Sequence, residues 1–203
     1  GGGGAEGTTR KGGEGGDGQV VITYTEAAVR VPGRIGQALD FDGTNDYIEV
    51  VTPSNLPTTD FTYSAWIRMD LSNAVQSIIM IADGAGADEF WLNVNASNKL
   101  ELQTNNAIVA TSNSTISTKT WTHVVARRLG SDVTLSINAA PEASGTDGTA
   151  LSFSTCSLLI GVEATATCIG TLTNYADGII DDIRVFNRAL TQDEIKRLYS
   201  MGR

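Results

Sequence analysis

The segment GIIDDIRVFNRAL, residues 178–190, decides which fold the chain is expected to adopt. Three of its β-branched residues favour a strand: Ile179, Ile183 and Val185. Side chains alternate between the two faces of a strand, so one of the adjacent carboxylates Asp181 and Asp182 must point towards the covered face of the sheet. A covered carboxylate needs a cation, a metal ion or several N–H donors as its partner.

The expected partner is ALDFDGTNDYIEV, residues 38–50, which is also rich in carboxylates. Its Gly, Thr, Asn and Asp residues at 43–46 are typical of a turn, and apolar residues flank them on both sides. This pattern predicts a strand, a turn and a second strand. We therefore expect these two distant segments to lie close together.

Four blocks of sequence carry a resemblance to a known family. They are ALDFDGTNDYIEV (38–50), FTYSAWIRM (61–69), WTHVVARR (121–128) and GIIDDIRVFNRALTQDEIKRLY (178–199). In this order they resemble laminin-G-like and concanavalin A-like jelly-roll domains. The resemblance implies an all-β fold, a two-sheet antiparallel jelly-roll sandwich. A capping box, Thr191-Gln-Asp-Glu194, predicts a short C-terminal helix.

Alternating side chains in residues 90–103 predict a polar face opposite the core. Phe90, Leu92 and Val94 mark the core side, as do Leu100 and Leu102. The opposite side carries a candidate sugar-binding set: Trp91, Asn93, Asn95, Glu101 and Gln103. An indole stacks on a pyranose ring while amides and carboxylates bind its hydroxyls, and this requires an accessible Trp91. The alternative is an ordinary amphipathic sheet face with an exposed or loop-covered tryptophan.

A structural calcium ion is a further expectation from the resemblance, because related jelly-roll domains hold Ca²⁺ between this turn and the last strand. The ligands it implies are Asp42, the carbonyl of Gly43, Asp46 and Asp181. Calcium prefers such a mixture of carboxylate and carbonyl oxygens. The alternative is that Asp181 accepts backbone N–H groups or pairs with an arginine, Arg34 or Arg184.

The charge of the chain limits its partners. With 14 basic and 23 acidic residues the net charge is −9, which disfavours nucleic acid and anionic membranes and suits neutral sugars and divalent cations better. No apolar run reaches the length of a membrane span, so we expect no membrane insertion. The modest share of charged residues, 18%, together with many Thr, Ser, Asn and Gly residues, is typical of extracellular β-proteins.

Cys156 and Cys168, the two cysteines of the chain, are predicted to form a disulfide. They are close in sequence, and the extracellular character permits oxidation. The alternative is a pair of buried free thiols.

The chain is expected to divide into a glycine-rich arm, residues 1–18, and one jelly-roll domain, residues 19–203, with a lead-in strand at 19–35. The arm contains ten glycines and resembles those of phage tail and bacterial surface proteins. Both a flexible linker and a packed segment fit this composition. We expect residues 1–24 to be suited to contact with assembly partners, and the chain to be a processed product or a fragment of a longer protein.

The predicted function is non-catalytic: an extracellular adhesion or carbohydrate-binding module on a phage, virion or cell surface, with a glycan or cell-surface polysaccharide as partner. The alternative is a structural decoration or assembly domain without a ligand. A glycoside hydrolase is the weakest candidate, because glycosidases of this fold place carboxylates two or three residues apart on one strand. Here Asp88-Glu89 and Asp181-Asp182 are adjacent, so their side chains diverge.

Overall fold

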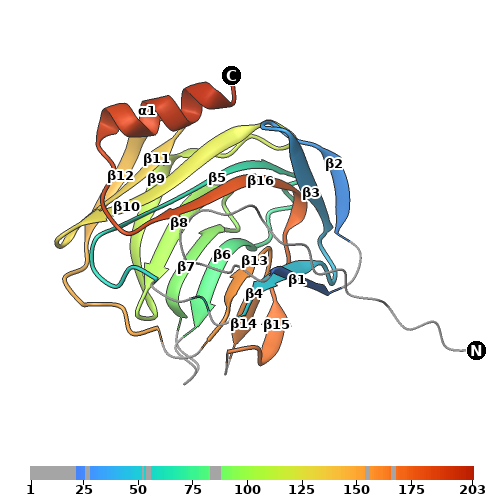
Figure 1. The fold of residues 1–203 in the computed structure, drawn as a ribbon, viewed down its shortest axis with the longest axis horizontal. Helices are drawn as coiled ribbons and strands as arrows, with labels where there is room; N and C mark the ends of the chain where they lie inside the picture. Colours follow the sequence, from blue (N-terminus) through green and yellow to red (C-terminus); the bar gives the residue numbers. More distant parts are fainter. Residues whose placement is uncertain are drawn as a thin grey trace, which may run out of the picture.

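The structure of the 203-residue chain is a computed structural model that describes residues 22–25, 28–51, 53, 56–82, 88–153, 156–165 and 168–203. The predicted arm, residues 1–18, lies outside these ranges. The described residues form two large antiparallel sheets, a small two-stranded sheet and one short helix (Figure 1). The all-β sandwich expected from the sequence is confirmed.

The first sheet, sheet A, has seven strands in the order β1-β4-β13-β6-β7-β8-β9. Its strands are β1 (Ile22–Thr25), β4 (Tyr47–Val50), β13 (Leu158–Ile160), β6 (Gln76–Ala82), β7 (Asp88–Val94), β8 (Lys99–Thr104) and β9 (Ala107–Thr115). The small sheet follows β13 in the chain and pairs β14 (Glu163–Thr165) with β15 (Thr171–Thr173).

The second sheet, sheet B, also has seven strands, in the order β12-β11-β10-β5-β16-β3-β2. Its strands are β12 (Ala140–Thr146), β11 (Asp132–Ile137), β10 (Thr122–Leu129), β5 (Phe61–Met69), β16 (Asp177–Phe186), β3 (Gln37–Asp42) and β2 (Val29–Pro32). The last strand, β16, lies between β3 and β5, so the chain completes sheet B only near its end.

The main core lies between the two sheets and consists of the inward residues of both. In β5 these are Phe61, Tyr63, Ala65, Ile67 and Met69, and in β7 they are Phe90, Leu92 and Val94. The ring of Phe90 stacks on Tyr63, 4.1 Å between centroids. The alternation predicted for residues 90–94 is therefore confirmed, because every apolar residue of that set joins the core.

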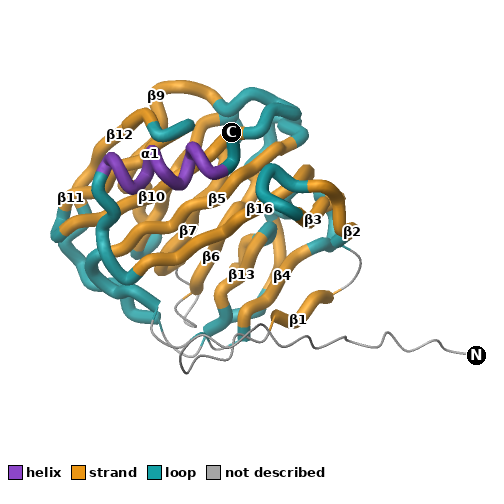
Figure 2. Tube along the Cα trace, turned by 45° about the horizontal axis from the view of Figure 1, so that its top comes forward, coloured by secondary structure: helices purple, strands orange, loops and turns teal. Residues whose placement is uncertain are grey.

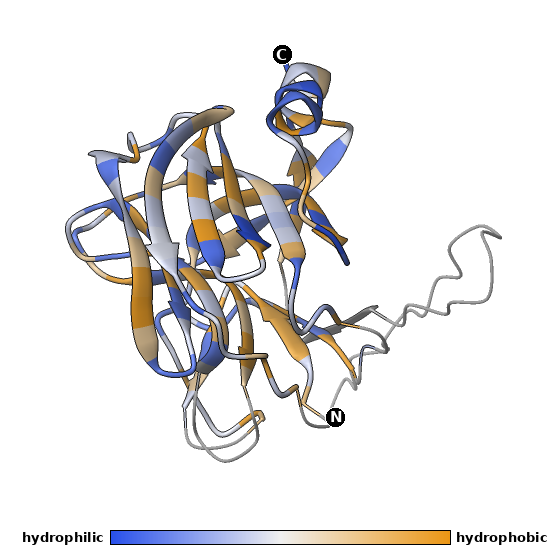
Figure 3. Ribbon diagram, turned by 90° about the vertical axis from the view of Figure 1, so that its left-hand side faces the viewer, coloured by the Kyte–Doolittle hydropathy of each residue, from blue (hydrophilic) through white to orange (hydrophobic). Residues whose placement is uncertain are grey.

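The helix α1 (Gln192–Met201) lies outside sheet B, at the C-terminal end of the chain (Figure 3), and it lies over β10 (Figure 2). Its buried residues Ile195 and Leu198 pack with Val125 of β10. The predicted capping box is present, since Thr191 and Glu194 satisfy each other's backbone N–H groups.

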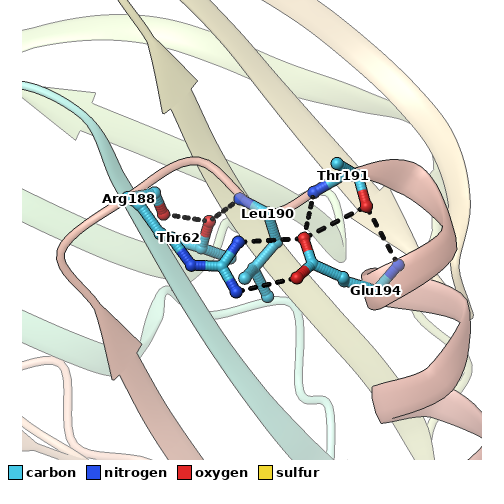
Figure 4. A network of polar contacts seen from close by, with 5 residues as sticks. All are labelled: Thr62, Arg188, Leu190, Thr191 and Glu194. Atoms are coloured by element: carbon cyan, nitrogen blue, oxygen red, sulfur yellow. Dashed lines mark hydrogen bonds and ion pairs between the residues drawn. The ribbon is translucent and has the colours of Figure 1, made fainter.

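A polar network fixes the start of this helix to β5 (Figure 4). The Thr62 hydroxyl donates to the Arg188 carbonyl at 2.9 Å and accepts the Leu190 N–H at 2.9 Å. Arg188 also donates both terminal nitrogens to the Glu194 carboxylate, at 2.9 and 2.7 Å. These hydrogen bonds fix the positions of the strand, the connecting segment and the helix relative to one another.

Candidate functional site

The predicted sugar-binding residues do lie on one face of two neighbouring strands. In the pairing of β7 with β8, Trp91 lies opposite Gln103 and Asn93 lies opposite Glu101. Asn95 continues the row and donates its Nδ2 to Glu101 at 3.0 Å. The sequence thus placed this set correctly, on the side of sheet A that faces away from the core.

The expectation that Trp91 is accessible to solvent is wrong. Only 6% of its surface is exposed, because the segment of β14 and β15 covers this part of sheet A. The indole packs with Val162, Leu172 and the Cys156–Cys168 disulfide, which is present as predicted. Its Nε1 donates to the Ser77 hydroxyl at 3.0 Å. A sugar ring cannot stack on Trp91 in this arrangement.

The polar members of the predicted set are also buried or already hydrogen-bonded within the protein. Asn93 is 0% exposed, and neither atom of its amide has a partner among the described residues. Asn95 accepts the backbone N–H groups of Ser97 and Lys99 and so shapes the β7–β8 turn. Buried Glu101 accepts hydrogen bonds from Asn95, Gln103 and Thr111. Trp91, Asn93 and Glu101 are therefore buried, whereas Asn95 and Gln103 are half-buried, and sugar binding by this face stays a prediction.

At the predicted metal site, the β3–β4 turn is stabilised by its own carboxylates. Asp42 Oδ1 accepts the Thr44 N–H at 2.8 Å, and Asp46 Oδ2 accepts the Asp42 N–H at 3.1 Å. Gly43 adopts φ +76°, where glycine is favoured, and a Cβ there would lie 3.0 Å from the Cβ of Asp177. The β16 carboxylate nearest this turn is thus Asp177, which pairs with Asp42 in the sheet.

Asp181, the fourth member of the predicted set, already binds backbone N–H groups, so its role as a calcium ligand stays a prediction. Its carboxylate accepts the N–H of Ile35 and the N–H of Asp182, both at 2.7 Å. A Cβ at Gly33 would lie 2.5 Å from Asp181 Oδ2, so a larger residue there would force this carboxylate to move. The alternative stated for Asp181, a carboxylate that binds backbone N–H groups, is the arrangement observed.

The described residues do not fit a calcium site of the predicted composition. Within the ranges that the structure describes, no group of three or more His, Cys, Asp or Glu side chains is placed to hold a metal ion. Burial raises the pKa of Asp177, and the charges of Asp70, Asp40 and Asp42 raise it further. Burial likewise raises the pKa of Asp46, although the N–H of Asp42 opposes this shift. Calcium at the turn stays a prediction that this geometry does not support.

A polar hollow of about 760 Å³ lies on the outer side of sheet B, beside the N-terminus of α1. We call it the α1 hollow. Its lining combines hydroxyl, amide, guanidinium and carboxylate side chains: Thr111 and Asn113 of β9, Arg127 of β10, Thr134 of β11, Pro141, Glu142, Ala143 and Ser144 of β12, and Gln192 of α1. No aromatic residue is among these lining residues.

Hydrogen bonds fix the wall of the α1 hollow. Asn113 Nδ2 donates to the Glu142 carbonyl at 2.5 Å, and Glu142 Oε2 accepts the Ser114 N–H at 3.0 Å. Gln192 Nε2 donates to the Ala139 carbonyl at 2.5 Å, which links the helix to the start of β12. This site was not predicted from the sequence, because its residues come from five separate elements. The available signal was Arg127, a cation on the outer side of a strand whose Val124 and Ala126 face the core.

The adjacent carboxylates considered for glycoside hydrolysis point to different partners. Asp181 accepts backbone N–H groups, whereas Asp182 accepts both hydrogen bonds from Arg184 Nε, at 3.0 and 2.9 Å. His123 is buried between sheet B and α1, beside Trp66 and Tyr199. Burial lowers its pKa to about 4, so it is neutral at pH 7. Neither feature supplies an acid–base pair in a cleft.

A family model described as the concanavalin A-like lectin/glucanases superfamily matches residues 42–196. This match spans most of the chain and agrees with the two-sheet architecture. The chain belongs to the concanavalin A-like lectin/glucanases superfamily. As a member of this superfamily it shares a fold with both binding proteins and enzymes, so the family alone does not assign its activity. A comparison with curated protein sequences found no significant match.

Solved structures similar to this superfamily member include domain 4 of AbnA, a GH43 extracellular arabinanase from Geobacillus stearothermophilus, in complex with arabinotriose. It is 18% identical with a TM-score of 0.70, over 90% of this chain and 88% of that chain. A SAP-like pentraxin from Limulus polyphemus is 19% identical with a TM-score of 0.64, over 79% and 80%. The binding domain of Paraclostridial Mosquitocidal Protein 1 is 17% identical with a TM-score of 0.70, over 92% of this chain and 50% of that one. At these identities the likeness establishes the fold.

Proposed function

We propose that this chain is a non-catalytic carbohydrate-binding module. The observation that carries the proposal is the α1 hollow, whose volume of about 760 Å³ lies in the range of ligand pockets. Hydroxyl and amide groups line it, and these are the groups that recognise sugar hydroxyls. The similar AbnA domain was solved in complex with arabinotriose, which supports a sugar as the ligand class.

We infer that the module works outside the cell, on a phage, virion or cell surface. The Cys156–Cys168 disulfide supports this, because such bonds persist mainly in oxidising compartments. The net charge of −9 keeps it away from nucleic acids and anionic lipids. Among the described residues, no helix has the length and apolar character needed to cross a membrane.

A glycan array probed with the full chain tests this function. We expect binding to a subset of glycans, and we expect Ser144→Trp to abolish it, because the indole would fill the α1 hollow. Ser152→Trp is the matched control, since Ser152 is also exposed but does not line the hollow. If no glycan binds, or if both variants bind like the wild type, this proposal is wrong.

A structural or assembly domain is the second candidate. The observation that favours it is the covered Trp91 face, since burial there stabilises the fold and offers no ligand surface. In this case residues 1–24 would contact the partners. Sedimentation of the full chain and of a chain beginning at residue 22, which keeps β1, separates the candidates, because only the assembly function predicts association that is lost in the shorter chain.

A further inference from the structure

Arg127 differs from the other arginines that are not fully exposed. Arg128 is buried and binds the Asp147 carboxylate at 3.2 Å, and half-buried Arg184 binds Asp182 at 2.9 Å. Arg127 is half-buried as well, yet its guanidinium has no ion pair or hydrogen bond within the described part of the chain. Its Nε is inaccessible to solvent and also lacks a partner there.

The position of Arg127 directs it into the α1 hollow. Val124 and Ala126 of β10 belong to the core, so Arg127 lies on the outer side of sheet B. It pairs with Thr62 of β5 and with Thr134 of β11, and Thr134 pairs in turn with Ser144 of β12. A row of polar side chains thus crosses four strands, with one cation at its centre.

We propose that the α1 hollow binds a carboxylate-bearing sugar residue, a uronic or sialic acid, and that Arg127 binds its carboxylate. This inference rests on the proposed carbohydrate-binding function and names its ligand class. A guanidinium presents paired N–H donors that match the two oxygens of a carboxylate. A half-buried guanidinium without an acceptor is unfavourable, so such a ligand would satisfy donors that the described residues leave unpaired.

The remaining lining specifies a sugar acid over other organic acids. Thr111, Thr134 and Ser144 offer hydroxyls, and no aromatic ring is present on which a flat ligand could stack. Glu142 keeps one carboxylate oxygen, Oε1, outside the described hydrogen bonds, where it can accept a sugar hydroxyl. The net charge of −9 belongs to the whole chain, whereas the hollow itself holds one cation and one anion.

Isothermal titration of the full chain with three probes tests the inference: an oligogalacturonate, sialyllactose and the methyl ester of whichever acid binds. Esterification keeps the shape of the sugar and removes its charge. A hydrogen bond to a charged group contributes about 1.5–3 kcal/mol, so we expect the ester to bind roughly 10–100-fold more weakly than the acid.

Two variants and a control locate the effect. We expect Arg127→Gln to weaken binding of the acid roughly 10–100-fold and to make the acid and the ester bind alike. Arg127→Lys should bind with intermediate affinity, because it keeps the charge and loses the paired donors. Arg30→Gln makes the same change in net charge at an exposed residue outside the hollow, and we expect less than about a twofold effect.

The outcomes separate this inference from the function on which it rests. If the ester binds as well as the acid and Arg127→Gln behaves like Arg30→Gln, or if only neutral glycans bind on the array, the carbohydrate-binding function stands and the assignment of an acidic ligand is wrong. If no glycan binds on the array and neither acid binds in the titration, both are wrong. Thermal unfolding of Arg127→Gln and Arg127→Lys shows whether each variant is folded, and a folded Arg127→Lys that binds the acid no more tightly than the ester also contradicts the proposal.

Discussion

Each large sheet carries a tryptophan on its outer side, and the chain covers the two by different means. Trp91 of sheet A lies under the segment of β14 and β15, beside the Cys156–Cys168 disulfide. Trp66 of sheet B lies under the end of α1, where it stacks on Tyr199 at 5.5 Å between ring centroids. A Cβ at Gly202 would lie 2.6 Å from the Trp66 ring. Both indoles are almost fully buried, at 6% and 1% exposure.

The difference shows that the outer face of a sheet is covered or open according to segments that arrive much later in the chain. Over sheet A, the covering segment is closed by a covalent bond and the indole N–H binds Ser77. Over sheet B, the cover is a helix held by its N-cap and by Thr62, and the Trp66 N–H has no acceptor among the described residues. The segment of β14 and β15 over Trp91 and the helix α1 over Trp66, which we call the two covers, should therefore respond differently to reduction of the disulfide, to pH and to loss of the helix N-cap.

The largest expected effect is the removal of either tryptophan. Trp91→Ala and Trp66→Ala should each lower the free energy of unfolding by about 3–5 kcal/mol, because each leaves a large cavity. Urea unfolding measures this, with Trp121→Ala as a control at a partly exposed position. A loss below about 1 kcal/mol for Trp91→Ala would mean that its face is open, and the sugar-binding role of that face would return.

Removal of the disulfide should weaken the cover of sheet A selectively. The bond closes a loop with a sequence separation of 12. Cys156→Ser with Cys168→Ser should cost roughly 3 kcal/mol of stability. Hydrogen exchange should rise in β6 and β7 near Trp91, and remain unchanged in α1. Equal increases at both covers would show that the two faces are not independent.

Acid should weaken the cover of sheet B. Burial holds the pKa of His123 at about 4 in the folded chain, below the ordinary 6.5, while Asp182 opposes this shift and Arg184 adds to it. The unfolded chain therefore binds more protons at His123 between these values, so its contribution to stability is complete above pH 6.5 and is lost as the pH falls to 4. The loss should be on the order of 3 kcal/mol. Urea unfolding measures this: between pH 4 and 6.5 the free energy of unfolding of His123→Gln should depend less on pH than that of the wild type.

Asp181 gives a smaller effect that also tests the metal prediction. Asp181→Ala leaves the Ile35 N–H without its acceptor, so we expect a loss of about 1–3 kcal/mol. The loss should be equal with calcium and with a chelator, because the carboxylate is already occupied by N–H groups. Thermal melts under the two conditions measure this, and a loss confined to the calcium sample would restore Asp181 as a metal ligand.

The smallest expected effect is the loss of the helix cap. Thr191→Ala removes the side chain that accepts the Glu194 N–H and should cost about 1 kcal/mol. Near-ultraviolet circular dichroism should report the loosened packing of Tyr199 on Trp66. If Thr191→Ala changes this signal more than loss of the disulfide does, the helix cap matters more to the packing of the tryptophans than the disulfide, which contradicts the expected order.

The sequence predicted what depends on local pattern. Alternation at residues 90–103 identified the core side and the polar side, and the spacing of Thr191 and Glu194 identified the cap. The pairing of Cys156 with Cys168 was also correct. In each of these cases the residues are close in sequence or occupy alternate positions of one strand.

What the sequence could not predict depends on register between distant strands. A bulge in β16 lies between Asp181 and Arg184, where Asp182 adopts φ +46°, and it determines which carboxylate meets the β2–β3 turn. Asp177, four residues earlier, faces the β3–β4 turn instead. The α1 hollow has the same origin, because its wall forms only when β9, β10, β11, β12 and the helix have assembled.

The place of β16 between β3 and β5 has a consequence for synthesis of the protein. While the ribosome is still adding residues before 177, β3 and β5 each lack one of their two partners and expose backbone N–H and C=O groups along one edge. Closure of sheet B must therefore wait for β16 to emerge, and pairing across such long sequence separations is slow. A nascent chain that stalls before Phe186 would present two open strand edges, one on β3 and one on β5, to its neighbours, so folding and escape from aggregation both depend on β16.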